Sequence, residues 1–272
     1  MSLPLWQVDA FSDGPFTGNP AAVCVLHEYP EASWMQSVAA EMNLSETSFV
    51  VPSEGIGNFQ LRWFTPGTEV DLCGHATLAA VHVLYESGRV PSESAIHFQT
   101  RSGELVCQRD AARIVLDFPQ TAVTSDVPEP LAEQTLQALG CATGNVLQTK
   151  FDLVVVLDDA QSVRELRPHF QQVAKIETRG VAVTAPSDCA EYDFISRFFA
   201  PSCGINEDPV TGSAHCGLAP FWSQSLQTTR LVGYQASPRG GFVHCEVGEH
   251  RVKLSGQALT ILEGHLLATP IA

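Results

Sequence analysis

Positively charged residues are scarce in this chain. Lysine and arginine together number 15 in 272 residues, against 30 aspartate and glutamate residues, which gives a formal net charge of −15. A surface with this excess of negative charge repels nucleic acids and anionic membranes, so we exclude both as partners. A local site for a small anion is still compatible with it.

Several familiar signals are absent from the sequence. No stretch approaches the ~20 apolar residues of a membrane span, and the N-terminus lacks the charged and apolar regions of a secretory signal, so we expect a cytoplasmic protein. The eight cysteines lie singly, with no Cys-x-x-Cys pair, and this predicts reduced, mostly buried thiols rather than a structural zinc site. No glycine-rich segment fits a nucleotide-binding fingerprint.

The sequence does contain a phrase that occurs twice. Arg62–Pro66 and Arg197–Pro201 both read arginine, two aromatic residues, a small residue and proline. Gly74 follows the first proline by eight residues, and Gly212 follows the second by eleven. Each copy is typical of a strand, a loop and the start of a helix. The repeat indicates two similar lobes, with function expected where the two copies meet.

Strand and helix signals mix along the chain without regular alternation. This favours an α+β fold, with a curved and mainly antiparallel sheet around a central helix in each lobe, over a doubly wound parallel sheet. We predict a first lobe over residues 1–118, completed by residues 259–272, and a second lobe over residues 119–258. The segment 119–130, which is rich in proline and threonine, is the expected crossover.

Two helices are central to this prediction. The first, Gly74–Glu86, is apolar nearly all round, so we expect it to be surrounded by protein. The second is expected over Ser213–Ser225, directly after the second copy of the phrase. Further helices are predicted at a capping box formed by Ser33 and Gln36, over Leu131–Leu139 and over Ser162–Val173.

The first central helix begins among chemically reactive residues. Cys73 and His75 flank Gly74, where unpaired backbone N–H groups and the helix dipole favour an anion such as a substrate carboxylate. The dipole contributes only ~0.3–1 kcal/mol, so substrate selection requires converging donors such as His75 and the Gly74 amide. The structural alternative is that Asp71 caps the helix and His75 merely lies in its first turn.

The second central helix has an equally polar start. Asp208, Thr211 and Ser213 surround it, and Gly212 allows a close approach to the backbone. An ordinary N-cap needs only one of these polar side chains. The two helix starts together therefore favour a functional site over two simple caps.

Glu46 is a third candidate. It lies between Ser45 and Thr47, just before the apolar run Phe49–Val51. A carboxylate in this position is either a solvated strand end or an acid/base group at the edge of apolar surroundings. Its spacing does not choose between the two.

Taken in order, these segments resemble the PhzF family, which is named for a phenazine-biosynthesis isomerase. The resemblance covers nearly the whole chain, and it is more specific for the family than for a substrate. It is carried by Val8–Phe11, Phe16–Pro20, Asn43–Thr47, Phe64–Pro66, Cys73–Thr77 and Asp208–Ala214, and it extends through Ser237–Gly241 to Ser255–Gly256.

The resemblance implies a diaminopimelate epimerase-like fold, with two pseudo-symmetric lobes and a site in the cleft between them. It matches Glu46 to the family's acid/base glutamate, and it matches His75, Asp208 and Ser213 to residues that line the site. We therefore predict that Glu46, His75 and Asp208 are catalytic, and that Cys73, Gly74, Gly212 and Ser213 bind substrate.

The reaction implied is a proton shift on a small anionic metabolite, such as a dihydro-hydroxyanthranilate-like diene acid. General acid–base assistance of this kind contributes ~10²–10⁴ in rate, so an acidic C–H bond and good positioning must supply the rest. We predict neither a cofactor nor a metal, and the resemblance makes a homodimer plausible.

Two alternative functions stay open. The wider superfamily includes amino-acid racemases with two catalytic cysteines at these repeated turns, where this chain has Cys73 and Thr211. A single thiol cannot perform a two-thiol racemisation, which leaves a cysteine-assisted epimerase or dehydratase related to proline racemase. A helix N-terminus lowers the pKa of a thiol and would make Cys73 reactive, although we favour a packing role. The other alternative is a non-catalytic binding protein that retains the fold.

Overall fold

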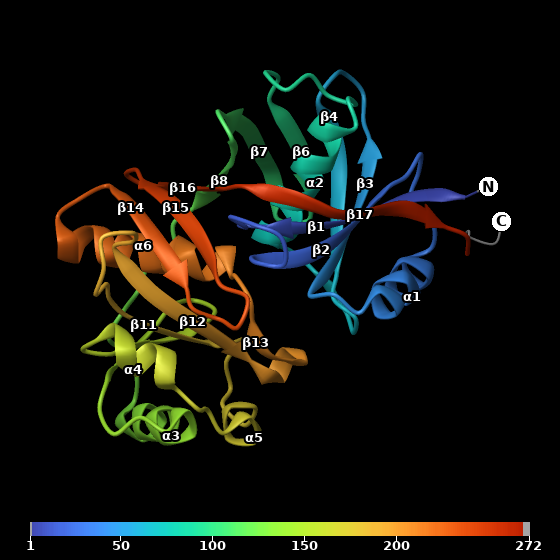
Figure 1. Cartoon of the computed structure of the whole chain (residues 1–272). Coiled ribbons are helices and arrows are strands. Elements are labelled where there is room, and N and C mark those ends of the chain that lie inside the picture. The colour runs from blue at the N-terminus through green and yellow to red at the C-terminus, as the bar shows by residue number, and fades with distance from the viewer. Residues whose placement is uncertain (1, 269–272) are drawn as a thin grey trace. The chain divides into compact units, whose positions relative to one another are not determined.

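The computed structural model describes residues 2–268 and divides the chain into two compact units (Figure 1). Unit 1 contains the residues up to Asp117 and those from Ser255 onward, and unit 2 spans Phe118–Leu254. In each unit, strands surround one central helix, so the α+β class predicted from the sequence is confirmed.

Unit 1 is built from strands at both ends of the sequence. Its helices are α1 (Ala32–Met42) and α2 (Gly74–Glu86). Its strands are β1 (Leu3–Ala10), β2 (Asn19–Val25), β3 (Glu46–Pro52), β4 (Asn58–Phe64), β5 (Glu69–Val70), β6 (Ile96–Thr100), β7 (Gly103–Asp110), β8 (Arg113–Pro119) and β17 (Ala258–Leu266).

Unit 2 carries more helix. Its helices are α3 (Glu129–Leu139), α4 (Ala160–Glu165), α5 (Phe170–Val173), a 3₁₀ turn over Pro201–Cys203, and α6 (Gly212–Leu226). Its strands are β9 (Asn145–Gln148), β10 (Leu153–Val156), β11 (Val181–Pro186), β12 (Phe194–Ala200), β13 (Ile205–Asp208), β14 (Arg230–Gln235), β15 (Gly241–Val247) and β16 (Arg251–Gly256).

The two units repeat one pattern of strand pairing. In unit 1, β3 pairs in parallel with β2 and antiparallel with β4, and β4 pairs antiparallel with β5 and in parallel with β6. In unit 2, β11 pairs in parallel with β10 and antiparallel with β12, and β12 pairs antiparallel with β13 and in parallel with β14. Each sheet is therefore mainly antiparallel, with parallel pairs where a helical crossover joins the strands.

The repeated phrase makes the same contact in both units. Arg62 on β4 donates from Nε and Nη2 to the two carboxylate oxygens of Glu69, at 2.6 and 2.8 Å. Arg197 on β12 donates in the same way to Glu207, at 2.7 and 2.9 Å. A two-point contact of this kind fixes the geometry of a turn more firmly than a single hydrogen bond. The repeat in sequence is thus a repeat in structure.

Helix α2 is enclosed by strands, as its composition predicts. Every residue from Gly74 to Tyr85 is buried, and the helix packs against β1, β2, β3 and β17 (Figure 1). The opposite side of β2, β3 and β4 packs against α1 through residues such as Met35 and Phe49. Strands covered on both faces are apolar along their length rather than alternating, which explains the run of buried residues in β2.

Helix α6 takes the equivalent place in unit 2, where it packs against β14 and β15. Helices α3 and α4 contribute Leu139 and Val163 to a separate core with β11 and β12. The helix is longer than α2 and includes Pro220 within its span. Its first residue, Gly212, corresponds to Gly74 of α2.

Two local predictions are wrong. A continuous helix over Ser162–Val173 is not formed, because Pro168 disfavours helical geometry at Arg167 and the segment divides into α4 and α5. The predicted capping box is not formed either. Helix α1 starts after Glu31, and Gln36 instead donates a hydrogen bond from Nε2 to the Thr65 carbonyl, at 2.8 Å.

Within residues 2–268, no helix is both long and apolar enough to span a membrane.

Candidate active site

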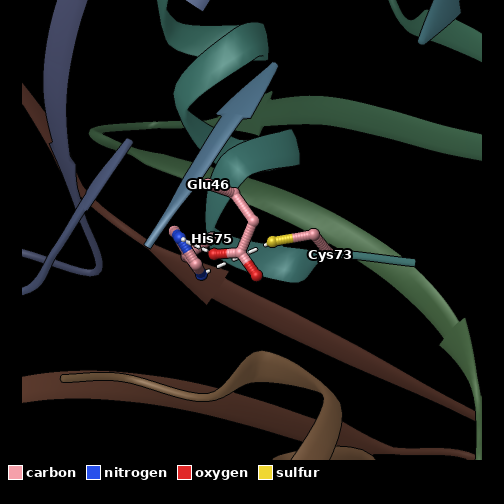
Figure 2. A group of neighbouring side chains, drawn as sticks. All are labelled: Glu46, Cys73 and His75. Atoms are coloured by element: carbon pink, nitrogen blue, oxygen red, sulfur yellow. Dashed lines mark hydrogen bonds and ion pairs between the residues drawn. The ribbon is translucent and has the colours of Figure 1, made fainter. Parts of the chain in front are cut away.

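Three predicted site residues of unit 1 converge at the start of α2 (Figure 2). Glu46 is the first residue of β3, Cys73 is the N-cap residue of α2, and His75 lies in its first turn. A hydrogen bond from Ser48 Oγ to the Ala76 carbonyl, at 2.8 Å, ties the beginning of β3 to this turn. The packing of α2 against β3 therefore brings together residues that lie 29 positions apart in the sequence.

The imidazole of His75 is the centre of this group. Its Nε2 atom lies 3.0 Å from Glu46 Oε2. Its Nδ1 atom lies 3.1 Å from the side-chain nitrogen of Asn19 and 3.5 Å from Cys73 Sγ. The side chain of His75 is only 4% exposed, whereas that of Glu46 is 15% exposed. The side chain of Glu46 is thus partly exposed, while the imidazole beside it is buried.

The surroundings of His75 favour its protonated form. Burial by itself lowers the pKa of an imidazole, but the interactions of His75 with Cys73 and Glu46 raise it, and the pKa of His75 is held well above its usual range. Burial, together with the charge on Glu46, raises the pKa of the Cys73 thiol. Since the thiol is then neutral at neutral pH, the Glu46 carboxylate is the charge that stabilises the imidazolium.

The raised pKa of Cys73 gives no support to the alternative of a reactive thiol. The helix N-terminus would lower the pKa of the thiol, but complete burial outweighs this effect. Asp71 does not cap α2, since the N-cap residue is Cys73 and no side chain makes a capping hydrogen bond there. The first backbone N–H groups of α2 are consequently not occupied by a side-chain cap.

The same three residues offer atom types that bind metal ions, and these atoms lie within 4.8 Å of one another. However, the sulfur of Cys73 faces Nδ1 of the imidazole, whereas the carboxylate of Glu46 faces Nε2. One ring nitrogen cannot face both partners, as coordination of a single zinc ion at ~2.0–2.3 Å would require. The arrangement suits proton transfer better than chelation.

In unit 2, the predicted residues lie at the start of α6. Asp208 ends β13, Thr211 is the N-cap residue, and Gly212 and Ser213 begin the helix. The Thr211 hydroxyl donates to Asp208 Oδ2 at 2.5 Å. As in α2, no side chain caps the helix. Asp208, Gly212 and Ser213 thus form one group in unit 2, as Glu46, Cys73, Gly74 and His75 do in unit 1.

Gln235 holds the turn before α6 in place. Its Nε2 atom donates to the Asp208 carbonyl at 2.7 Å and to Thr211 Oγ1 at 3.1 Å, and its Oε1 atom accepts from the Thr211 amide at 2.8 Å. The side chain is almost fully buried. Because these bonds span the whole turn, Gln235 positions Asp208 relative to the helix start.

Sequence reasoning did not single out four residues that contact the candidate site. Asn19 lies in the segment Phe16–Pro20 that carries the family resemblance, so a signal for it existed. Gln235 lies at the end of a strand that was not predicted. The others are Arg179, which bonds to Ser213, and Asp152, which bonds to Arg179. No motif marks either of them.

The sequence matches the phenazine biosynthesis-like protein family, PhzC-PhzF, over residues 8–264. It is 46% identical over 267 residues to an uncharacterized isomerase of Halalkalibacterium halodurans, covering 98% of this chain and 99% of that protein. The structure of a PhzF-family phenazine biosynthesis protein from Enterococcus faecalis aligns with a TM-score of 0.90 at 42% identity, covering 98% of this chain and 99% of that one. A probable proline racemase from Agrobacterium radiobacter K84 aligns with a TM-score of 0.65 at 10% identity, covering 99% and 94%, and is similar in fold alone.

Proposed function

Because the chain belongs to the phenazine biosynthesis-like PhzC-PhzF family, we propose that it is a cofactor-independent isomerase that shifts a proton between carbon atoms of a small carboxylate-bearing substrate. The family match and the curated relatives named as isomerases support the general class. The contact between Glu46 and His75 is the single observation that supports proton transfer as the chemistry.

In this proposal Glu46 is the acid/base group. Its carboxylate takes a proton from an acidic carbon of the substrate, and the electrons of the broken C–H bond enter the adjacent conjugated system. The protonated Glu46 then returns the proton to a different carbon, which moves the double bond and regenerates the carboxylate. General acid–base assistance of this type contributes ~10²–10⁴ in rate.

His75 supports Glu46 in two ways. Its imidazolium lies 3.0 Å from the carboxylate and orients it toward the substrate. The amide of Asn19 lies at the other ring nitrogen and holds the plane of the ring; the N–H of an imidazolium is paired there when the amide presents its oxygen rather than its nitrogen. The catalytic assignment of Asp208 rests on the turn in which Gln235 and Thr211 hold it.

A carboxylate on the substrate suits both helix starts. The first turns of α2 and α6 lack side-chain caps, so the backbone N–H groups near Gly74 and Gly212 can receive an anion. Cys73 and Ser213 lie beside these amides and complete the proposed substrate-binding set.

Cysteine-assisted epimerisation is less well supported. A thiol must ionise to act as a base, and the pKa of Cys73 is raised by its burial and by the nearby charge on Glu46. The equivalent helix start carries Thr211, which has no thiol. This alternative and a non-catalytic binding role are best separated by experiment.

The experiment is solvent-deuterium exchange, followed by NMR, with the protein incubated with a dihydro-hydroxyanthranilate and related unsaturated acids in deuterated water. We expect deuterium to enter a C–H position with the unaltered protein and with Cys73→Ala, but not with Glu46→Gln. Glu54→Gln, which changes an exposed glutamate beyond the far end of β3, is the matched control and retains exchange.

The reverse pattern, with exchange kept in Glu46→Gln and lost in Cys73→Ala, would replace acid/base isomerisation with thiol chemistry. Binding of these acids without any exchange would instead assign a non-catalytic binding role.

A further inference from the structure

Arg179 is held rigidly beside the proposed site of unit 2. Its Nε and Nη2 atoms donate to the two carboxylate oxygens of Asp152, at 2.8 and 2.5 Å. The guanidinium also lies over the rings of Phe151 and Phe198, at 5.5 and 5.7 Å from their centroids. Asp152 is 4% exposed and Arg179 is 35% exposed. A guanidinium that is bound at two points and packed against aromatic rings has little freedom to move.

The third nitrogen of this guanidinium, Nη1, contacts Ser213. Arg179 Nη1 donates to Ser213 Oγ at 3.0 Å. A serine hydroxyl has one O–H donor and two acceptor lone pairs, and an arginine can only donate. Arg179 therefore occupies an acceptor position and leaves the hydroxyl hydrogen available. Among residues 2–268, Ser213 Oγ has no other hydrogen-bond partner.

Strand register shows that this contact has a counterpart in unit 1. Thr47 pairs with Phe64, and Val181 pairs with Phe199. Phe64 and Phe199 occupy the same place in the repeated phrase, so Thr47 corresponds to Val181. It follows that Glu46 corresponds to Gly180, the neighbour of Arg179.

The helix starts correspond in the same way. Gly74 matches Gly212, and His75 matches Ser213. Each unit therefore joins a residue at or just before the start of one strand to the second residue of its central helix, and both contacts measure 3.0 Å. In unit 1 the pair is Glu46 and His75, and in unit 2 it is Arg179 and Ser213.

Steric crowding explains why Arg179 takes this role instead of its neighbour. A Cβ atom at Gly180 would collide with the ring of Phe198, so a side chain at the position equivalent to Glu46 is excluded. The functional group of unit 2, a guanidinium, therefore comes from Arg179, the residue before Gly180. The result is a hydroxyl aligned by a guanidinium where unit 1 has an imidazole aligned by a carboxylate.

From this geometry we propose that Arg179 is a positioning residue, which fixes the Ser213 hydroxyl as a hydrogen-bond donor to the carboxylate of the substrate. The role is orientation rather than attraction at a distance, because Asp152 neutralises the guanidinium. The proposal rests on the proposed function only in taking Ser213 as a substrate-binding residue.

The test is calorimetric titration with anthranilate, a stable aromatic carboxylate, and with its uncharged amide 2-aminobenzamide. Arg179→Met and Ser213→Ala are each expected to raise the Kd for anthranilate by ~10- to 100-fold, the range for losing a hydrogen bond to a charged group. The Kd for the amide is expected to change less than threefold. Combining the two changes is expected to weaken binding no further than Ser213→Ala does, because Arg179 acts through Ser213.

Two further variants separate this role from simple stabilisation. Arg164→Met is the matched control, since Arg164 makes a similar two-point contact with Asp188 and is 33% exposed. It is expected to leave both Kd values unchanged. If Arg179→Met fails to fold because Asp152 is left as an unpaired buried charge, the double change Arg179→Met with Asp152→Asn removes that charge and is titrated instead.

The proposal is overturned if anthranilate binds these folded variants as it binds the unaltered protein, if the effects of Arg179 and Ser213 are additive, or if the unaltered protein does not bind anthranilate. These outcomes are independent of deuterium exchange. If deuterium exchange requires Glu46 but the Kd for anthranilate is unchanged in the Arg179 and Ser213 variants, the proposed isomerase function stands and the proposed role of Arg179 is wrong. If the variants lose binding of anthranilate selectively but neither they nor the unaltered protein exchange deuterium, the role of Arg179 stands and the protein is a binding protein rather than an isomerase.

Discussion

Glu46 Oε2 and His75 Nε2 lie 3.0 Å apart at the junction of β3 and α2, where the imidazole is almost completely buried. Burial opposes protonation of His75, but its interactions with Cys73 and Glu46 outweigh burial and raise the pKa of His75. We therefore expect NMR titration of the His75 ring to give a pKa above ~6.5, the ordinary value for histidine. Glu46→Gln should lower that pKa.

The same shift gives a pH dependence of stability. Because the pKa of His75 is higher in the folded protein than in the unfolded chain, the stabilisation is complete below ~6.5 and is lost as the pH rises through the folded value. Urea unfolding of the unaltered protein and of His75→Gln at several pH values should show the difference between them shrink at alkaline pH. Glu54→Gln is expected to leave the pH dependence of unfolding unchanged. A His75 ring that titrates below pH 6.5 in the unaltered protein would contradict the prediction.

Asn19 is expected to matter for both stability and turnover. Its side chain is fully buried and contacts His75 Nδ1 at 3.1 Å. Asn19→Ala removes one partner of a buried hydrogen bond, so we expect a loss of ~1–3 kcal/mol in the free energy of unfolding. The rate of exchange should fall more than KM changes, because the imidazole loses its alignment. Asn58→Ala, which removes a surface hydrogen bond to the Glu54 carbonyl, is the control and should leave the rate of exchange unchanged.

Cysteine accessibility predicts the order of alkylation. Cys189 and Cys203 are exposed, and backbone hydrogen bonding at Glu191 lowers the pKa of Cys189. Cys73 is buried and its pKa is raised by that burial. Iodoacetamide at neutral pH should therefore modify Cys189 first, as followed by peptide mass spectrometry, without loss of exchange activity. Early modification of Cys73 with parallel loss of activity would point to thiol chemistry.

The architecture could be predicted because two strong patterns carry it. The repeated phrase marks equivalent turns, which the contacts of Arg62 with Glu69 and of Arg197 with Glu207 repeat. The apolar character of Gly74–Glu86 requires a surrounding sheet, and the structure provides one. Local helix signals were less reliable where tertiary contacts compete with them. Gln36 fits a capping box by spacing but bonds to the Thr65 carbonyl instead.

The site could be predicted only as far as its motifs reach. The sequence marks Glu46 and His75 as candidates and the resemblance implies their roles, but their contact depends on the packing of α2 against β3, which spacing does not encode. Arg179 and Gln235 have no motif at all, because an arginine before a strand and a glutamine at the end of one are ordinary residues. Their roles arise from strand register and from the turn geometry before α6.

His215 gives unit 2 a pH dependence opposite in sign to that of His75. It lies buried in α6 with Nδ1 2.9 Å from the Thr211 carbonyl, and burial lowers the pKa of His215 to about 4. His215 becomes protonated near pH 6.5 in the unfolded chain but only near pH 4 in the folded protein, so stability is lost as the pH falls across this window. The shift corresponds to a loss on the order of 3 kcal/mol. Urea unfolding at pH 7 and at pH 4.5 measures how much the free energy of unfolding falls in acid. This decrease should be smaller for His215→Gln than for the unaltered protein. The control, His250→Gln at an exposed position of the same unit, should show the full decrease. An identical acid loss in all three proteins would mean that His215 is already protonated in the folded state.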